Sequence, residues 1–165
     1  MSLERLWAGW RSEYVSSAAV DDGDDCVLCR IAGSDDDRAA HVVWRGEVAL
    51  AVLNAYPYTS GHLMVMPRRH VGELEALDEE EAAEVWRALS DAVRAIRQAY
   101  QPDGLNVGAN LGRVAGAGVP GHFHLHVLPR WSGDTNFMTA VAEARVLPEA
   151  LPVSWERLRK AWPPA

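Results

Sequence analysis

Three histidines alternate with apolar residues in the segment Gly121-His-Phe-His-Leu-His-Val-Leu128, and this pattern constrains the fold most strongly. Side chains point to opposite faces at successive positions of a β-strand. The segment 122–129 is therefore predicted to be a strand whose apolar face, Phe123, Leu125 and Val127, packs on a core. The other face carries three imidazoles in a row, and each one needs hydrogen-bond partners. Packing alone does not explain such a row, so we expect a functional site there.

The remaining periodicity predicts a single α+β domain over residues 1–165, with an N-terminal arm of about 1–40 and a catalytic core of about 41–165. Apolar residues recur at helical spacing between Asp78, a plausible N-cap, and Tyr100, which predicts one long amphipathic helix. A shorter helix is expected over 154–162. Because strands come before and after the long helix and two are joined by a short turn, we expect a mainly antiparallel sheet with short flanking helices. Its five strands are predicted at 41–45, 48–54, 62–67, 105–111 and 122–129.

The charge of the chain argues against several classes of partner. The formal net charge is −7, and much of the acid lies in two loops, 21–25 and 35–37. A polyanion such as duplex DNA would be repelled by this field, whereas a small phosphorylated ligand could still meet local arginines near the motifs. Residues 1–15 lack the apolar stretch of a signal peptide, and no run suits a membrane span. We therefore expect a cytoplasmic protein with neither a nucleic-acid nor a membrane partner. The arginines in question are Arg68, Arg69, Arg113 and Arg130.

Two kinds of chemistry use a row of histidines. One is a metal site, because imidazole is the commonest ligand of zinc and similar ions. The other is nucleophilic attack on phosphorus by one neutral imidazole whose tautomer is fixed by its neighbours. The loop 112–121 is rich in glycine and feeds the strand, and its backbone N–H groups suit an anion nest. Next to three histidines, this loop favours phosphate chemistry over a metal site.

The chain resembles the histidine-triad (HIT) family, whose motif His-φ-His-φ-His-φ-φ matches residues 122–128 at every position. A second block, Asn54-Ala-Tyr-Pro-Tyr-Thr-Ser-Gly-His62, has the family's spacing between an Asn or Asp and a His. The stretches 6–11 and 129–137 resemble a bacterial branch described as diadenosine-tetraphosphate phosphorylases or hydrolases. The resemblance extends over about residues 3–162 and implies the HIT-like fold.

The resemblance also implies a mechanism. The middle histidine, His124, attacks the α-phosphorus of a nucleotide and forms a nucleotidyl-histidine, which water or phosphate then cleaves. His126 and the backbone of 116–121 would bind phosphoryl oxygens, where preorganised donors lower the barrier most. His62 completes the catalytic set, Asn54 would hold the ribose and Leu53 would contact the base. The nucleotide-binding residues expected are Asn54, Leu53, Asn110, Gly116, Gly118, Val119 and Trp131.

One departure from the family pattern concerns the leaving group. Many members carry Ser or Thr three residues before the first histidine, often with Gln before it, whereas this chain has Gly118 and Val119. A side-chain hydroxyl toward the leaving group is therefore missing. Asn110 and Arg113 are candidates to replace it, and the leaving-group preference stays open.

The only two cysteines form the pair Cys26-Val-Leu-Cys29. A disulfide is not expected in a cytoplasmic protein, which leaves a redox pair, a metal site or two ordinary thiols. The resemblance implies a zinc site in which His70 and His122 complete the set, with His41 as a competitor for the third place. A Cys₂His₂ set around zinc is a closed, structural site, so we expect one zinc per chain.

Three other readings remain. The first is a nucleotide-binding sensor with little turnover, which would not need the nucleophile His124. The second is an enzyme whose metal lies at the histidine row, and the third is a zinc-knuckle nucleic-acid binder, which the charge argues against. Hydrolase and phosphorylase share the first half-reaction, so spacing does not separate them. Members of the family commonly dimerise by pairing the long helix and a sheet edge of two copies. The resemblance therefore implies a homodimer.

Overall fold

The structure is a computed structural model that describes residues 26–134 and 149–164. The described residues do not include the motif at 6–11 or the acidic loop at 21–25. They include only the beginning of the stretch 129–137. Within the described ranges, no helix combines the length and apolar character needed to cross a membrane.

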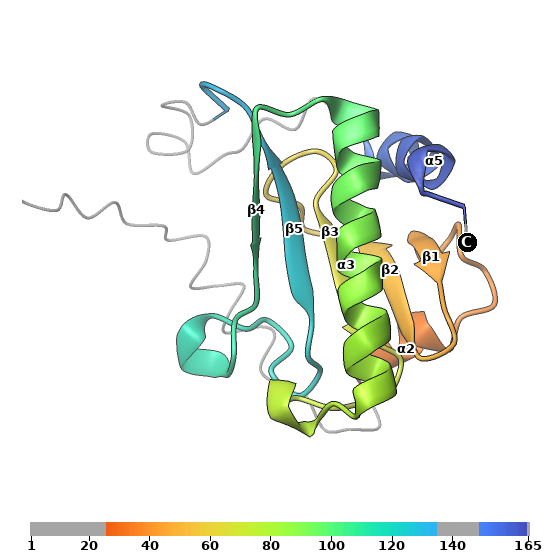
Figure 1. The fold of residues 1–165 in the computed structure, drawn as a ribbon, viewed down its shortest axis with the longest axis vertical. Helices are drawn as coiled ribbons and strands as arrows, with labels where there is room; N and C mark the ends of the chain where they lie inside the picture. Colours follow the sequence, from red (N-terminus) through yellow and green to blue (C-terminus); the bar gives the residue numbers. More distant parts are fainter. Residues whose placement is uncertain (1–25, 135–148, 165) are drawn as a thin grey trace, which may run out of the picture.

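One antiparallel sheet organises the fold, in the spatial order β1-β2-β3-β5-β4. Figure 1 shows the five strands side by side, with β4 at one edge and β1 at the other. The predicted α+β class and the five-stranded antiparallel sheet are confirmed. The strands are β1 (Val42–Arg45), β2 (Ala49–Leu53), β3 (Leu63–Pro67), β4 (Gly104–Gly108) and β5 (Leu125–Arg130).

The long helix α3 (Glu79–Tyr100) covers one face of the sheet (Figure 1). Its start is fixed as the sequence predicts: the Asp78 carboxylate accepts the Glu81 N–H, and the Glu81 carboxylate accepts the Asp78 N–H. The apolar face of α3 packs on alternate residues of β2, β3 and β5, among them Leu63 and Val127. This is the main core, and Phe123 belongs to it as the alternation predicts.

The opposite face of the sheet carries a smaller core and the short helix α2 (Val27–Ala32). Cys26 immediately precedes this helix and is only 2% exposed, packed with Leu28, Val52 and Met64. Cys26, which belongs to the predicted N-terminal arm, is therefore part of this smaller core. The helix docks because Leu28 and Ala32, four residues apart, present one apolar stripe to the sheet.

The C-terminal helix α5 (Leu151–Ala161) lies beside α3 and β1. Leu158 and Ala161 enter the main core, and the Trp155 indole N–H donates to the Val42 carbonyl over 2.9 Å. Two short 3-10 helices lie in connections: η2 (Leu74–Ala76) before α3 and η3 (Arg113–Ala115) after β4.

Strand β5 begins later than predicted, at Leu125 instead of His122. The reason lies in the backbone hydrogen bonds of the preceding residues, because His122 N–H donates to Val119 and Phe123 N–H donates to Val71. These bonds hold 122–124 outside the ladder. Strand β4 ends at Gly108, which pairs with His126. The end of β4 therefore lies close to the beginning of β5.

A buried carboxylate closes the β1–β2 turn. Glu84 of α3 is 8% exposed and accepts the backbone N–H groups of Glu47, Val48 and Ala49, at 3.2, 2.6 and 2.6 Å. Gly46 leaves room for this contact, since a Cβ there would lie 2.7 Å from the Glu84 carboxyl. Thus one side chain accepts three backbone N–H groups at the β1–β2 turn.

We expect Glu84→Ala to lower the free energy of unfolding by about 3 kcal/mol, because it leaves buried backbone donors without an acceptor. Urea denaturation measures the loss. The matched control is Glu80→Ala, an exposed carboxylate in the same helix, for which we expect a change below about 1 kcal/mol. Equal losses in the two variants would contradict this role of Glu84.

Candidate active site

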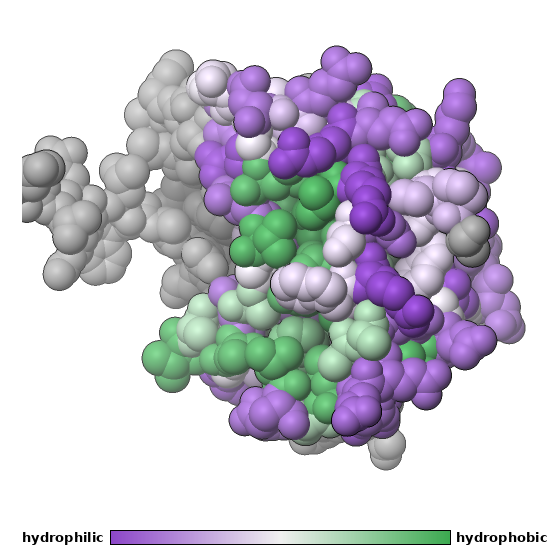
Figure 2. All heavy atoms as spheres, viewed as in Figure 1, coloured by the Kyte–Doolittle hydropathy of each residue, from purple (hydrophilic) through white to green (hydrophobic). Residues whose placement is uncertain are grey.

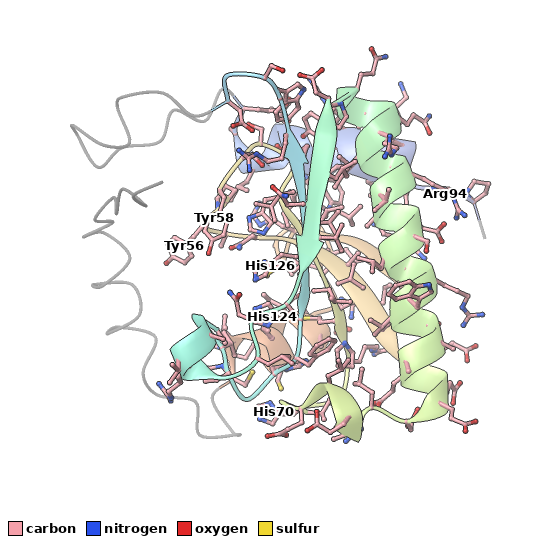
Figure 3. All side chains as sticks on the ribbon, turned by 60° about the vertical axis from the view of Figure 1, so that its left-hand side comes forward. Tyr56, Tyr58, His70, Arg94, His124 and His126 are labelled. Carbon is pink, nitrogen blue, oxygen red and sulfur yellow. The ribbon has the colours of Figure 1, made fainter. Side chains whose placement is uncertain are left out.

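The imidazoles of His62, His124 and His126 gather on the sheet face that points away from α3. Strand β5 supplies His126, and His124 immediately precedes it. His62 comes directly before β3, where the Gly61-His62 turn delivers it. The rings of His124 and His126 lie edge to face at 4.9 Å, and those of His62 and His126 are 5.0 Å apart. Figure 3 shows His126 near the end of β4 and His124 just beyond it.

The His124 ring has a fixed tautomer. Its Nδ1 lies 2.8 Å from the carbonyl oxygen of His122, which can only accept, so Nδ1 carries the proton. The lone pair is therefore on Nε2. His124 is 6% exposed, and burial lowers the pKa of the imidazole against a smaller opposing effect of this hydrogen bond. Both features favour a neutral ring that can act as a nucleophile.

A chain of hydrogen bonds orients the other two imidazoles. The Tyr58 backbone N–H donates to His62 Nδ1 over 3.2 Å, so the proton of His62 is on Nε2. His62 Nε2 then donates to His126 Nδ1 over 2.9 Å, which places the proton of His126 on Nε2. His62 is fully buried, and the Tyr58 ring lies 4.9 Å from its ring. This series of hydrogen bonds leaves Nε2 of His126 as a hydrogen-bond donor.

Four predicted ligand residues meet at one end of the histidine row. The ligand atoms of Cys26, Cys29, His70 and His122 all lie within 4.8 Å of one another. Cys29 Sγ is 3.2 Å from His70 Nδ1, and both sulfurs are 3.5 Å from His122 Nδ1. The competitor His41 is not in this cluster.

These distances suit a tetrahedral ion. With Zn–S of about 2.3 Å and Zn–N of about 2.0 Å, neighbouring S and N ligands lie about 3.5 Å apart. In addition, His122 Nε2 donates to the Pro67 carbonyl over 2.9 Å, which leaves the Nδ1 lone pair directed at the sulfurs. A ligand histidine anchored through its other nitrogen is usual at metal sites. The four residues therefore fit a metal ion.

Asn54 and Leu53 lie at the end of β2, but on different sides. Asn54 is half-buried beside the histidines: its Oδ1 accepts the Tyr56 N–H over 2.9 Å, and its Nδ2 is 3.5 Å from His62 Nδ1. Leu53 is 3% exposed and packs in the main core beneath α3. Its side chain is on the opposite face of the sheet, a position that does not support the expected contact with a base.

The glycine-rich loop leads directly into the segment that carries His122 and His124. Asn110 Nδ2 donates to the Gly116 carbonyl over 3.2 Å, and Gly116 has a φ of 92°, which favours glycine. Val119 packs against the smaller core, and its carbonyl accepts His122 N–H. The loop is thus tied directly to the strand that follows it, with Gly118 between these anchored residues.

Other expected contributors are engaged elsewhere. Trp131 lies edge-on to the Tyr100 ring at 6.2 Å, beyond the end of β5. Arg69 is paired with Glu81 and Arg130 with Asp134, so these two cations are already neutralised by carboxylates. Whether a phosphorylated ligand meets these arginines, as expected from the sequence, stays a prediction.

Two residues at the site were not predicted from the sequence. Tyr58 contributes a backbone N–H and a ring against His62, and Tyr100 packs behind Gly61. Tyr58 lies four positions before His62 in the block that resembles the family, so the sequence offered a signal for it. The contact from Tyr100 required knowledge of how α3 crosses the sheet.

Comparison with known proteins agrees with this geometry. The HIT domain family model matches residues 36–133. A Mycobacterium tuberculosis protein named AP-4-A phosphorylase is 39% identical, over 97% of this chain and 85% of that protein. Protein hit of Bacillus subtilis is 33% identical over 69% of this chain and 77% of that protein. The crystal structure of a Zn-bound histidine triad family protein from Mycobacterium smegmatis is 30% identical with a TM-score of 0.68, covering 85% of this chain and 94% of that chain. The chain belongs to the HIT family.

Proposed function

We propose that this chain cleaves the phosphoanhydride or phosphoramidate bond at the α-phosphorus of a nucleotide, through a nucleotidyl-histidine on His124. The observation that carries the proposal is the 2.8 Å hydrogen bond from His124 Nδ1 to the His122 carbonyl. It fixes the lone pair on Nε2 of a buried ring, which is the form a nucleophilic imidazole requires.

In the first step the Nε2 lone pair of His124 forms a bond to the α-phosphorus, and the bond from phosphorus to the leaving group breaks. His126, with its proton on Nε2, stabilises the charge that develops on the phosphoryl or leaving-group oxygen. The Tyr58–His62–His126 chain keeps that donor in place. In the second step water or inorganic phosphate attacks phosphorus and releases His124.

The nucleotide would be held from two sides. Asn54 offers a donor and an acceptor to the ribose hydroxyls, and the backbone from Gly116 to Val119 offers N–H groups to the phosphates. The similarity to the AP-4-A phosphorylase of M. tuberculosis supports a dinucleoside polyphosphate as substrate. Phosphate is then the expected acceptor in the second step, with water as the alternative.

The alternative readings fit the site less well. A metal-centred enzyme would need the ion at His124 and His126, whereas His122 is oriented toward the cysteines. A binding-only sensor would not need the paired orientation of His62 and His126 behind a buried imidazole. A sensor remains the second candidate, and turnover separates the two.

We expect His124→Ala to lower kcat by more than about 10⁴-fold, because no other imidazole takes its place on the row. The fold and nucleotide affinity should change little. Wild-type enzyme quenched during turnover should carry one nucleotidyl group, detected by mass spectrometry, and the variant none. Turnover by the variant near the wild-type rate would remove His124 as the nucleophile. Undetectable turnover by the wild type, with tight nucleotide binding, would favour the sensor.

Product analysis separates hydrolase from phosphorylase. Diadenosine tetraphosphate is incubated with the wild type, with and without inorganic phosphate, and the nucleotides are separated by chromatography. A phosphorylase releases ADP and ATP and depends on phosphate, whereas a hydrolase releases AMP and ATP without it.

We also propose that the four-residue cluster holds one structural zinc ion per chain. The donor set and the 3.2–3.5 Å separations support a closed tetrahedral site. Cys26, Cys29 and His70 would connect α2 and the end of β3 to His122. Bound there, the ion would cross-link these segments and would not need to contact the phosphate.

We expect Cys26→Ser with Cys29→Ser to reduce zinc from about one per chain to near zero and to lower the Tm by about 10 °C or more. Elemental analysis and calorimetry measure the two effects. Activity per folded molecule should fall much less than in His124→Ala. The matched control is His41→Ala, which should keep its zinc. If the purified wild type contained no metal and the double variant had the same Tm as the wild type, the cysteines would be ordinary thiols.

We further propose that two copies associate across β4. Within residues 26–134 and 149–164, β4 pairs only with β5, so its other edge offers backbone groups to a second β4. Figure 2 shows apolar side chains gathered over β4 and the loop that follows it. Val107 is 48% exposed and Val114 fully so, and Trp86 of α3 is 68% exposed. A second copy would cover this apolar surface.

We expect Val107→Lys to reduce the mass in light scattering from two chains to one, because a lysine on the paired edge opposes association. The control is Val153→Lys, which is equally exposed on α5 but away from the patch. A wild type that is already monomeric, or an unchanged dimer in Val107→Lys, would exclude this interface.

A further inference from the structure

The turn that delivers His62 is held from behind by an aromatic ring. Gly61 has a φ of 80°, and a Cβ at this position would lie 2.6 Å from Cε2 and 2.9 Å from Cζ of Tyr100. The ring of Tyr100 therefore occupies the place where any side chain at 61 would begin. Because Gly61 is directly followed by His62, this ring limits how far the backbone of His62 can move.

Tyr100 is itself fixed at the end of α3 by the C-terminal helix. Its hydroxyl donates to Glu149 Oε1 over 2.6 Å, and Ser154 Oγ donates to the same oxygen over 2.7 Å. Arg157 pairs with Glu149 Oε2 at 2.9 Å, and its guanidinium lies 5.0 Å from the centre of the Tyr100 ring. Burial, with a further contribution from Glu149, raises the pKa of Tyr100, so the phenol keeps its proton and remains a donor.

His62 is the residue for which this support matters. It is fully buried and must direct Nε2 at His126 Nδ1, at 2.9 Å, for the proton of His126 to lie on Nε2. The His126 side chain comes from β5, whereas His62 comes from the turn before β3. Their hydrogen bond therefore depends on how the turn is placed against the sheet.

We propose that Tyr100 is a positioning residue for His62, acting through the packing of its ring against Gly61. The proposal rests on the function proposed above for its kinetic part only. The Tyr100 ring presses on Gly61, Gly61 sets His62, and His62 sets the tautomer of His126. None of Tyr100, Glu149 and Arg157 needs to touch the substrate.

The test compares Tyr100→Ala with Tyr100→Phe. Removal of the ring should lower kcat by about 10- to 100-fold, the range expected when a catalytic group is displaced by about 1 Å, with KM changed less than about 3-fold. Tyr100→Phe keeps the ring against Gly61 and should retain kcat within about 3-fold. A large kcat loss in Tyr100→Phe equal to that of Tyr100→Ala would overturn the role of the ring.

A second readout needs no substrate. The ¹⁵N shifts of the imidazole nitrogens report the tautomers of His62 and His126 in the free protein. We expect protons on Nε2 of both rings in the wild type and in Tyr100→Phe, and a mixture of tautomers at His126 in Tyr100→Ala. An unchanged spectrum in folded Tyr100→Ala would overturn the proposal, even if the proposed enzymatic activity proved wrong.

Loss of stability alone is controlled by Val85→Ala, which makes a cavity in the main core at the other end of α3. This variant should be destabilised yet keep kcat and the imidazole spectrum, and the same changes in both variants would contradict a positioning role. Should Tyr100→Ala fail to fold, Tyr100→Leu replaces it with the same expected outcomes. Gly61→Ala should disturb the His62 and His126 signals in the wild-type background, and an undisturbed spectrum there would also overturn the proposal.

Discussion

The hydrogen bond between His124 Nδ1 and the His122 carbonyl is the interaction on which the arrangement of the site depends. It links two residues of one short segment, so it forms only if this segment leaves the loop in the right conformation. That conformation is held on the other side by Phe123, which is buried in the main core and whose N–H donates to Val71. The apolar face of the segment thus fixes the backbone, and the backbone fixes the imidazole.

The two faces of the sheet have different roles for this reason. The face beneath α3 is apolar, and each Leu or Val fully buried there contributes about 1.5–3 kcal/mol relative to exposure. The other face combines the smaller core with buried imidazoles, whose desolvation must be offset by hydrogen bonds. His62, His122 and His124 each have such a bond to the protein. Burial of the apolar face beneath α3 therefore stabilises a fold whose other face contains polar groups that are costly to bury.

Much of this could be predicted because the signals are local. The long helix follows from apolar spacing and from the Asp78–Glu81 capping pair, and the two faces of the histidine segment follow from strand alternation. The late start of β5 could not be predicted, since the bonds from His122 and Phe123 go to Val119 and Val71 in irregular segments. Alternation also placed Val52 and Leu53 on opposite faces without showing which face has the histidines. Only the register with β3 decides this, and it puts Leu53 under α3.

Several contacts that hold the fold and the site together share a further property, which is long sequence separation. Tyr100 meets Gly61, Cys26 meets His122, and Glu84 meets the β1–β2 turn, and no local pattern encodes such pairs. Resemblance to a family supplied the cysteine–histidine grouping, and it did so because those residues carry recognisable spacing. Tyr100 and Glu84 have no such motif, so only the packing of α3 on the sheet reveals them.

Neighbouring histidines of one motif end in opposite tautomers, and this difference divides the work of the site. His122 donates through Nε2 to Pro67 and directs Nδ1 toward the cysteines, whereas His124 donates through Nδ1 and keeps the lone pair on Nε2. The acceptor is a backbone carbonyl in both cases, so neither tautomer can reverse without losing its hydrogen bond to that carbonyl. An ion bound at Nδ1 of His122 would therefore not compete for Nε2 of His124, the nitrogen proposed to attack phosphorus. The same backbone that separates these nitrogens allows the proposed metal ligand His122 and the proposed nucleophile His124 to stand two positions apart.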